Sequence, residues 1–140
     1  MSNWLFDLGN SRLKCAPLHG DGSLGEVVAL AHAESRFLED LQAALPAHGD
    51  SACLSSVASP ALTTAVVETL ASRYQRVSLA RSVSQLAGVR IAYAEPSRLG
   101  VDRFLTLLAA RARAPGAWLV AGVGTALTID LLDAQGHHHG

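Results

Sequence analysis

Residues 4–18 read WLFDLGNSRLKCAPL, two apolar runs separated by a glycine-asparagine pair. Trp4, Phe6 and Leu8 stand at every second position, as the residues on one face of a strand do, and Leu13 resumes an alternation after the pair. This pattern predicts a β-hairpin with a tight turn, in which Gly9 is free to adopt a positive φ.

The same turn has the composition of a phosphate-binding site. Gly9 has no Cβ, so a ligand can approach the backbone amides closely. Asp7 ends the first strand and can hold Mg²⁺, an ion that takes few carboxylates and keeps several waters. Ser11 and Lys14 supply hydrogen-bond donors for phosphate oxygens. An ordinary hairpin with a solvated carboxylate and ammonium is the alternative that this segment alone leaves open.

Residues 93–103, YAEPSRLGVDR, lead into an amphipathic stretch in which Val101, Leu105 and Leu108 share one helical face. Asp102 then lies in the first helical turn, and Arg103 points about 100° away from it. Such a pair offers an acceptor for an alcohol proton beside a cation for a carboxylate. In the alternative reading, the carboxylate only complements the positive end of the helix dipole.

Residues 122–130, GVGTALTID, contain another glycine turn between apolar runs, with hydroxyls and a terminal Asp130. Alone, this segment predicts a second hairpin. It begins like a dinucleotide-binding fingerprint, but Leu127 occupies the third glycine position and strand alternation follows, which disfavours a Rossmann site.

Composition indicates a compact domain that acts on a small molecule. The chain has 140 residues, 49% of them hydrophobic, and a net charge of -1, so it has no basic field for nucleic acid or an anionic membrane. The apolar stretch 114–129 is broken by glycine and proline, and no signal peptide is visible, so we expect a cytoplasmic protein. Cys15 and Cys53 lie in apolar strand-like runs and are predicted to be reduced core thiols.

Hydrophobic periodicity predicts an α/β domain with a mixed sheet. The expected strands are 4–8, 11–18, 26–31, 52–57, 75–79 and 89–93, and the expected helices are 35–45, 60–73 and 100–113. Near Pro115-Gly116 the helical pattern breaks, and residues 118–121 and 126–132 are expected to form a further hairpin.

Together, these segments resemble the type III pantothenate kinases of the acetate and sugar kinase/Hsc70/actin superfamily. The family signature resembles an Asp-x-Gly-Asn-Ser/Thr turn, then Gly-x-Asp-Arg opening a helix, then Gly-Thr-Ala-x-Thr-x-Asp. The chain carries DLGNS at 7–11, GVDR at 100–103 and GTALTID at 124–130, in that order. Residues 53–57, CLSSV, also look like the Ser-Ser-Val segment of the family.

The resemblance implies an RNase H-like domain over residues 1–115, a mixed sheet flanked by helices. Residues 116–140 would open a second, incomplete RNase H-like domain, as in the duplicated architecture of actin-like ATPases. The implied reaction is ATP-dependent phosphorylation of pantothenate to 4′-phosphopantothenate, the first step of coenzyme A biosynthesis. Mg²⁺, a monovalent cation (K⁺ or NH₄⁺) and a homodimer are also implied, and the 140-residue chain by itself is expected to be inactive.

The resemblance also assigns roles to single residues. Asp102 would be the general base, and Asp7 would hold Mg²⁺. The residues expected to contact the ATP phosphates are Asp7, Gly9, Asn10, Ser11, Lys14 and Thr125. The residues expected to line the pantothenate pocket are Tyr93, Gly100, Val101, Asp102 and Arg103. Asp130 would be the ligand of the monovalent cation.

Other functions remain open at this stage. A non-catalytic regulatory relative is favoured by Gly122, where many relatives have an acid, and is opposed by the intact Asp7 and Asp102. Another small-molecule kinase of the same superfamily would share the fold. A nuclease of RNase H type is disfavoured, because Ser55-Ser56 stands where a further metal-binding acid would be needed. We expect residues 137–139, three successive histidines, to have no metal role.

Overall fold

The structure is a computed structural model that describes residues 2–140, and these form two compact units that divide between Ala80 and Arg81. In the first unit the elements are β1 (Asn3–Leu8), β2 (Arg12–Leu18), β3 (Val28–Ala31), α1 (Phe37–Ala44), β4 (Gly49–Ser56), α2 (Pro60–Ala71) and β5 (Tyr74–Leu79). In the second they are β6 (Gln85–Leu86), β7 (Val89–Arg90), the 3₁₀ turn η1 (Pro96–Arg98), α3 (Val101–Arg113), β8 (Trp118–Val123) and β9 (Leu127–Leu132).

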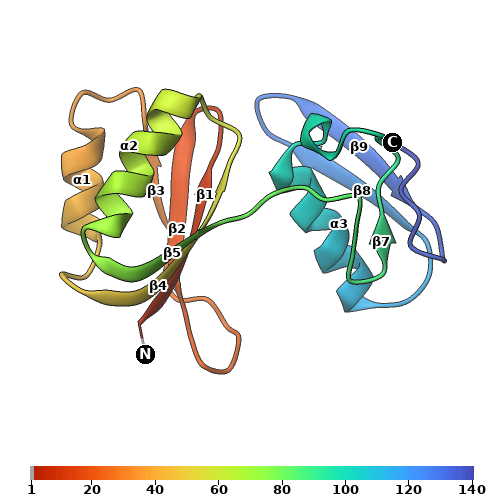
Figure 1. Cartoon of the computed structure of the whole chain (residues 1–140), viewed down its shortest axis with the longest axis horizontal. Coiled ribbons are helices and arrows are strands. Elements are labelled where there is room, and N and C mark those ends of the chain that lie inside the picture. The colour runs from red at the N-terminus through yellow and green to blue at the C-terminus, as the bar shows by residue number, and fades with distance from the viewer. Residues whose placement is uncertain (1) are drawn as a thin grey trace. The chain divides into compact units, whose positions relative to one another are not determined.

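The first unit is a mixed five-stranded sheet in the order β3-β2-β1-β4-β5. β1, β2 and β3 form an antiparallel meander, whereas β4 and β5 run parallel to β1. The two parallel connections pass through α1 and α2, and both helices lie on the same face of the sheet (Figure 1). Helical crossovers are the usual way to connect parallel neighbours.

The core of this unit lies between that face and the helices. Phe6, Leu8 and Leu54 project from β1 and β4 against Leu41 of α1 and Leu70 of α2, and all five are buried. Each such side chain contributes about 1.5–3 kcal/mol by leaving water. Since side chains alternate along a strand, the neighbours of the core residues in β1, β2 and β4 lie on the face that carries no helix.

α2 begins where the sequence provides a start signal. The Ser59 hydroxyl accepts a hydrogen bond from the Leu62 backbone N–H, and Pro60 occupies the first helical turn, where its missing N–H has no cost. The helix therefore begins directly after β4.

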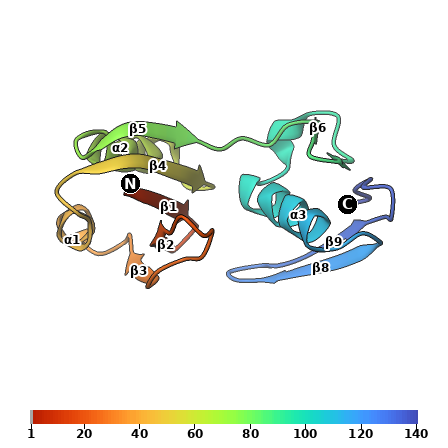
Figure 2. The same cartoon turned by 90° about the horizontal axis from the view of Figure 1, so that it is seen from below.

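The second unit packs α3 against the β8–β9 hairpin, and Figure 2 shows the two running alongside each other. Phe104 and Leu107 of α3 join Val89, Leu99 and Leu132 in a small buried core. Trp118 and Val120 of β8 are partly buried against it. The opposite face of the hairpin is apolar and exposed; its members are Leu119, Ala121, Val123, Leu127, Ile129 and Leu131.

Most of the predicted elements are confirmed, and the structure differs from the sequence analysis at β6 and at Cys53. The two-residue strand β6, which pairs with β7, was not predicted. Cys15 is buried, and burial raises its pKa to about 11, but Cys53 is exposed and is not a core thiol, because it lies on the helix-free side of β4. The compact units divide at 80/81, and the hairpin after Gly116 packs on α3; the domain boundary at 115/116 stays a prediction.

None of the helices in residues 2–140 has the length and apolar character needed to cross a bilayer.

Candidate functional site

In the first unit, a row of polar side chains crosses three neighbouring strands. Asp7 of β1 lies opposite Lys14 of β2 on one side and opposite Ser55 of β4 on the other. The Ser55 hydroxyl donates to Asp7 Oδ1 across 3.3 Å. Phe6 and Leu8 point into the core, so this row lies on the helix-free face. An exposed carboxylate and an exposed ammonium thus stand side by side at the end of the sheet strands.

The β1–β2 turn differs from the predicted one. Three residues, Gly9–Ser11, connect the strands, and Gly9 is not among the glycines with positive φ. The Gly9 N–H donates to the Arg12 carbonyl over 2.9 Å, so it is not free for a ligand. A three-residue connection closes without a left-handed residue at its first position, so Gly9 does not use the positive φ that glycine permits.

The remaining amides of the turn are available. Within residues 2–140, the backbone N–H groups of Asn10 and Ser11 have no protein acceptor. His32 supports the turn from the far side: its Nε2 donates to the Gly9 carbonyl over 2.9 Å, and its backbone N–H donates to the Ser11 carbonyl. The turn is therefore anchored through its carbonyls, while two of its amides have no acceptor within residues 2–140.

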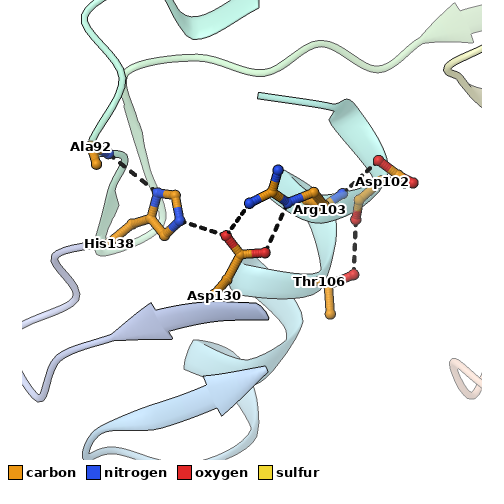
Figure 3. Close-up of polar contacts among 6 residues, drawn as sticks. All are labelled: Ala92, Asp102, Arg103, Thr106, Asp130 and His138. Carbon is orange, nitrogen blue, oxygen red and sulfur yellow. Dashed lines mark hydrogen bonds and ion pairs between the residues drawn. The ribbon is translucent and has the colours of Figure 1, made fainter. Parts of the chain in front are cut away.

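In the second unit, three charged or polar side chains form one network (Figure 3). Arg103 of α3 binds Asp130 of β9 through two parallel hydrogen bonds, Nε to Oδ2 at 2.9 Å and Nη2 to Oδ1 at 2.6 Å. His138 Nε2 donates to Asp130 Oδ1 at 2.8 Å. Paired forks of this kind combine charge attraction with fixed geometry.

The electrostatics of this network follow from its contacts. Burial alone would raise the pKa of Asp130, but the hydrogen bonds from Arg103 and His138 outweigh it and hold that pKa below the ordinary carboxyl value. The hydrogen bond to Asp130 likewise raises the pKa of Arg103, against the opposing effect of burial. Asp130 is therefore an anion bound to a fixed cation.

Asp102 and Arg103 are adjacent in α3 but have different partners. Asp102 is exposed, and its Oδ1 accepts only from the Arg103 backbone N–H, at 2.8 Å. The Thr106 hydroxyl donates to the backbone carbonyl of Asp102 and not to its carboxylate. In the described part of the chain, the carboxylate has no hydrogen bond to another side chain. The guanidinium is turned toward Asp130, as Figure 3 shows. One helix end thus presents an unneutralised carboxylate and a held cation.

The other predicted residues of this unit lie at various depths. Val101 is buried in the first turn of α3, and Gly100 caps the helix. Tyr93 is partly buried, with its ring 6.0 Å from that of His138. Thr125 is exposed in the β8–β9 turn. Asp102, Arg103 and Tyr93 therefore belong to one unit, whereas Asp7, Lys14 and the turn amides belong to the other.

The two implied metal ions differ in their fit to these residues. Asp7 is an exposed carboxylate with one oxygen free of Ser55, which suits Mg²⁺ surrounded by waters. Asp130 does not suit a monovalent cation, because both of its oxygens accept from Arg103 or His138 and the guanidinium already supplies the positive charge. The surroundings of Gly122 are tight. A Cβ at this position would lie 2.6 Å from Thr128 Oγ1, so a side chain there would require the Thr128 hydroxyl to move.

Sequence reasoning did not assign roles to Ser55, His32 or His138. Each acts through a partner far along the chain: Asp7, Gly9 and Asp130, respectively. Strand register would have found Ser55 once β1 was paired with β4. No periodic pattern points to the two histidines.

Comparison with known proteins identifies a single family. The family model described as type III pantothenate kinase matches residues 4–140. Proteins named type III pantothenate kinase from Xanthomonas oryzae pv. oryzae (strain PXO99A) and Stenotrophomonas maltophilia (strain K279a) are 56% and 55% identical to the chain over 140 residues. In both cases the match covers 100% of the chain and 56% of the relative, so the chain spans little more than half the length of these proteins.

Proposed function

The chain belongs to the type III pantothenate kinase family, and from that premise we propose that its protein transfers the γ-phosphoryl group of ATP to the primary hydroxyl of pantothenate. This would be the entry step to coenzyme A. The observation that carries the proposal is the end of α3, where Asp102 is free to accept a proton and Arg103 is held as a cation one residue away.

Asp102 is the proposed general base. Its exposed carboxylate has an oxygen without a protein donor in residues 2–140, so it can accept the proton of a substrate hydroxyl. Phosphoryl transfer depends mainly on positioning and charge neutralisation, and a base within hydrogen-bond reach adds a further factor. If Asp102 removes the proton as the hydroxyl attacks, positive charge does not build up on the attacking oxygen.

Arg103 is the proposed contact for the pantothenate carboxylate. Its Nε and one Nη2 proton are used by Asp130, and a guanidinium has five N–H donors, so others remain for a ligand. A cation fixed in this way recognises a carboxylate without losing side-chain freedom on binding. Tyr93, Gly100 and Val101 are proposed to line the same pocket.

The phosphate site is proposed for the first unit. Lys14, Ser11 and the free amides of Asn10 and Ser11 would donate to ATP phosphate oxygens, and Gly9 leaves room for them. Thr125, in the β8–β9 turn, is a further proposed phosphate contact. Asp7 would hold Mg²⁺, which when bound neutralises charge on the phosphates. We do not carry the monovalent cation at Asp130 forward, for the reason given above.

The larger architecture is also part of the proposal. The outer face of the β8–β9 hairpin is apolar and exposed, which is typical of strands that are covered within a larger protein. This supports the opening hairpin of a second RNase H-like domain in a duplicated, actin-like architecture. A homodimer is proposed from the family alone.

Asp102→Asn tests the function in a full-length version of the kinase, in which this chain is continued to the length of its relatives. The amide has the same shape but cannot take the proton, so turnover with ATP and pantothenate should fall by roughly 10²–10⁴-fold. The unfolding temperature should be unchanged, because Asp102 is exposed. The affinity for Mg-ATP should also be unchanged, because Asp102 is not among the proposed phosphate contacts. Asp40→Asn, an exposed acid in the first turn of α1, is the matched control and should retain full turnover.

The outcome separates the candidate functions. Wild-type turnover in Asp102→Asn would remove the base from the mechanism. A wild-type protein that binds ATP but turns over no substrate would indicate the non-catalytic relative, which the glycine at 122 favours. Turnover of a different alcohol in place of pantothenate would indicate another kinase of the superfamily.

A further inference from the structure

We propose that His138 is a positioning residue for the kinase reaction: acting through Asp130, it fixes the direction in which Arg103 presents its remaining N–H donors to the substrate. The inference rests on the proposed function, since it takes Arg103 as the contact for the substrate carboxylate. No sequence motif assigned this role, and the histidine itself touches no reacting atom.

Two residues of the network, Asp130 and His138, are buried. The exposed fractions of Asp130 and His138 are 2% and 3%, so their hydrogen bond lies away from solvent. Arg103 is partly buried and reaches the surface. The chain of contacts thus runs from a buried histidine through a buried carboxylate to a guanidinium with access to a ligand (Figure 3).

The hydrogen bonds of His138 determine which ring nitrogen carries the proton. The Ala92 backbone N–H points at His138 Nδ1, 3.2 Å away, so Nδ1 must be the acceptor. Nε2 then carries the proton, and this N–H group donates a hydrogen bond to Asp130 Oδ1. A neutral ring with this tautomer satisfies both contacts, whereas a proton on Nδ1 would point at the Ala92 N–H. The hydrogen bonds therefore select one form of the ring.

The hydrogen bond from His138 to Asp130 also affects the orientation of Arg103. Asp130 Oδ1 accepts from both His138 and Arg103, whereas Oδ2 accepts from Arg103. The histidine therefore fixes the plane of the carboxylate, and the paired fork transmits that plane to the guanidinium. Without it, the carboxylate can rotate about its bond to Cβ and the guanidinium can follow. The ring also binds Ala92, so it ties the residue next to Tyr93 to the same network.

Two variants of the full-length kinase test this. His138→Leu removes the donor to Asp130 and should raise the KM for pantothenate about tenfold, the effect of losing one hydrogen bond to a charged group. The KM for ATP should not change, and kcat should fall less than the KM for pantothenate rises. His138→Gln retains an amide donor and should recover most of the affinity for pantothenate. A role in folding alone would not separate the two substrates.

His139→Leu is the matched control. His139 is the next residue, is exposed, and contacts Asp133 at 2.8 Å, outside the network. Its substitution should leave both KM values as in the wild type. If His138→Leu does not fold, the tautomer of His138 in the wild type decides, because a proton on Nδ1 contradicts the donor role of Nε2.

A spectroscopic measurement tests the geometry without activity. Long-range ¹H–¹⁵N spectra of the 140-residue chain should show His138 protonated at Nε2 near neutral pH, and a proton at Nδ1 would overturn the proposal. In the kinetic arm, a wild type without pantothenate-dependent turnover would overturn the proposed function and this inference with it. Wild-type turnover together with an unchanged KM for pantothenate in His138→Leu would overturn the inference alone.

Discussion

At the scale of single residues, neighbours in sequence have separate tasks because the helix turns them apart. Asp102 keeps its carboxylate in solvent while Arg103 reaches back to Asp130. The sequence was sufficient to predict that the two need not neutralise each other, since adjacent helical positions differ by about 100°. It was not sufficient to predict the partner of Arg103. That contact depends on how the β8–β9 hairpin packs on α3.

Gly9 allows a test of the phosphate turn that does not disturb the fold. Its φ is not positive, and a Cβ would approach nothing closer than the Arg12 carbonyl, at 3.4 Å. Gly9→Ala should therefore unfold at the wild-type temperature. If phosphates rest on the neighbouring amides, the added methyl should still weaken Mg-ATP binding to the full-length kinase by roughly tenfold, about the cost of one charge-assisted hydrogen bond. Calorimetric titration measures this.

Gly20→Ala is the control for that substitution. Gly20 lies in the loop after β2, has no positive φ, and a Cβ there would meet nothing within 4 Å. Equal Mg-ATP affinity in Gly9→Ala, Gly20→Ala and the wild type would leave the turn an ordinary hairpin. A loss of folding in Gly9→Ala would show that the hairpin itself needs the glycine.

At the scale of elements, periodicity was enough to place the strands and helices because their apolar positions repeat with the period of the structure. The predicted helix at 100–113 and the observed α3 differ by one residue at the start. The sequence failed where structure depends on few residues: β6 has two, too short for an alternation. It also gave the wrong turn after β1, because a Gly-Asn pair does not fix the length of the connection.

The Arg103–Asp130–His138 network joins α3, β9 and the C-terminal residues, so acid should weaken the second unit. The pKa of Asp130 is lowered in the folded state, so its stabilising effect is complete above the ordinary carboxyl pKa of about 3.9. It is lost as the pH falls through the lower folded value. Trp118 lies in this unit and Trp4 in the other, so Trp118 emission in a Trp4→Phe background reports on it alone.

The experiment is urea unfolding of that background at neutral and acid pH. The free energy of unfolding should fall on acidification, and the fall should be smaller when Asp130→Asn is added, because an amide does not titrate. Asp40→Asn should retain the full acid effect, since this exposed acid is absent from the network. An equal fall in the Asp130→Asn protein would mean that other carboxylates account for the acid sensitivity.

At the scale of the whole molecule, hydrophobic periodicity predicted the α/β class, and the mixed sheet and helices confirm it. The predicted domain boundary at 115/116 follows the break in the helical pattern and stays a prediction; the compact units divide at 80/81. Helix α3 explains the difference: its buried side chains pack with Leu132 and Trp118, which lie beyond the break. Patterns along the chain show where elements end, but packing decides which elements stay together.

The apolar outer face of the β8–β9 hairpin leads to a prediction about the 140-residue chain. Leu119, Leu127 and Ile129 are at least half exposed on it, on the side away from α3. An exposed patch of this kind, on a two-stranded sheet with open edges, favours association. The chain should therefore show a concentration-dependent rise in mass by sedimentation velocity. The double variant Leu119→Lys/Leu127→Lys should be monomeric at concentrations where the wild type associates.

That variant should fold as the wild type does, because the two leucines are 69% and 67% exposed and contribute little to the core. Leu24→Lys is the matched control: Leu24 is 53% exposed in the first unit, so a charge there should leave association unchanged. A wild type that stays monomeric at all concentrations would contradict the prediction. So would a Leu24 variant that dissociates as fully as the double variant, because charge in general, and not this face, would then control assembly.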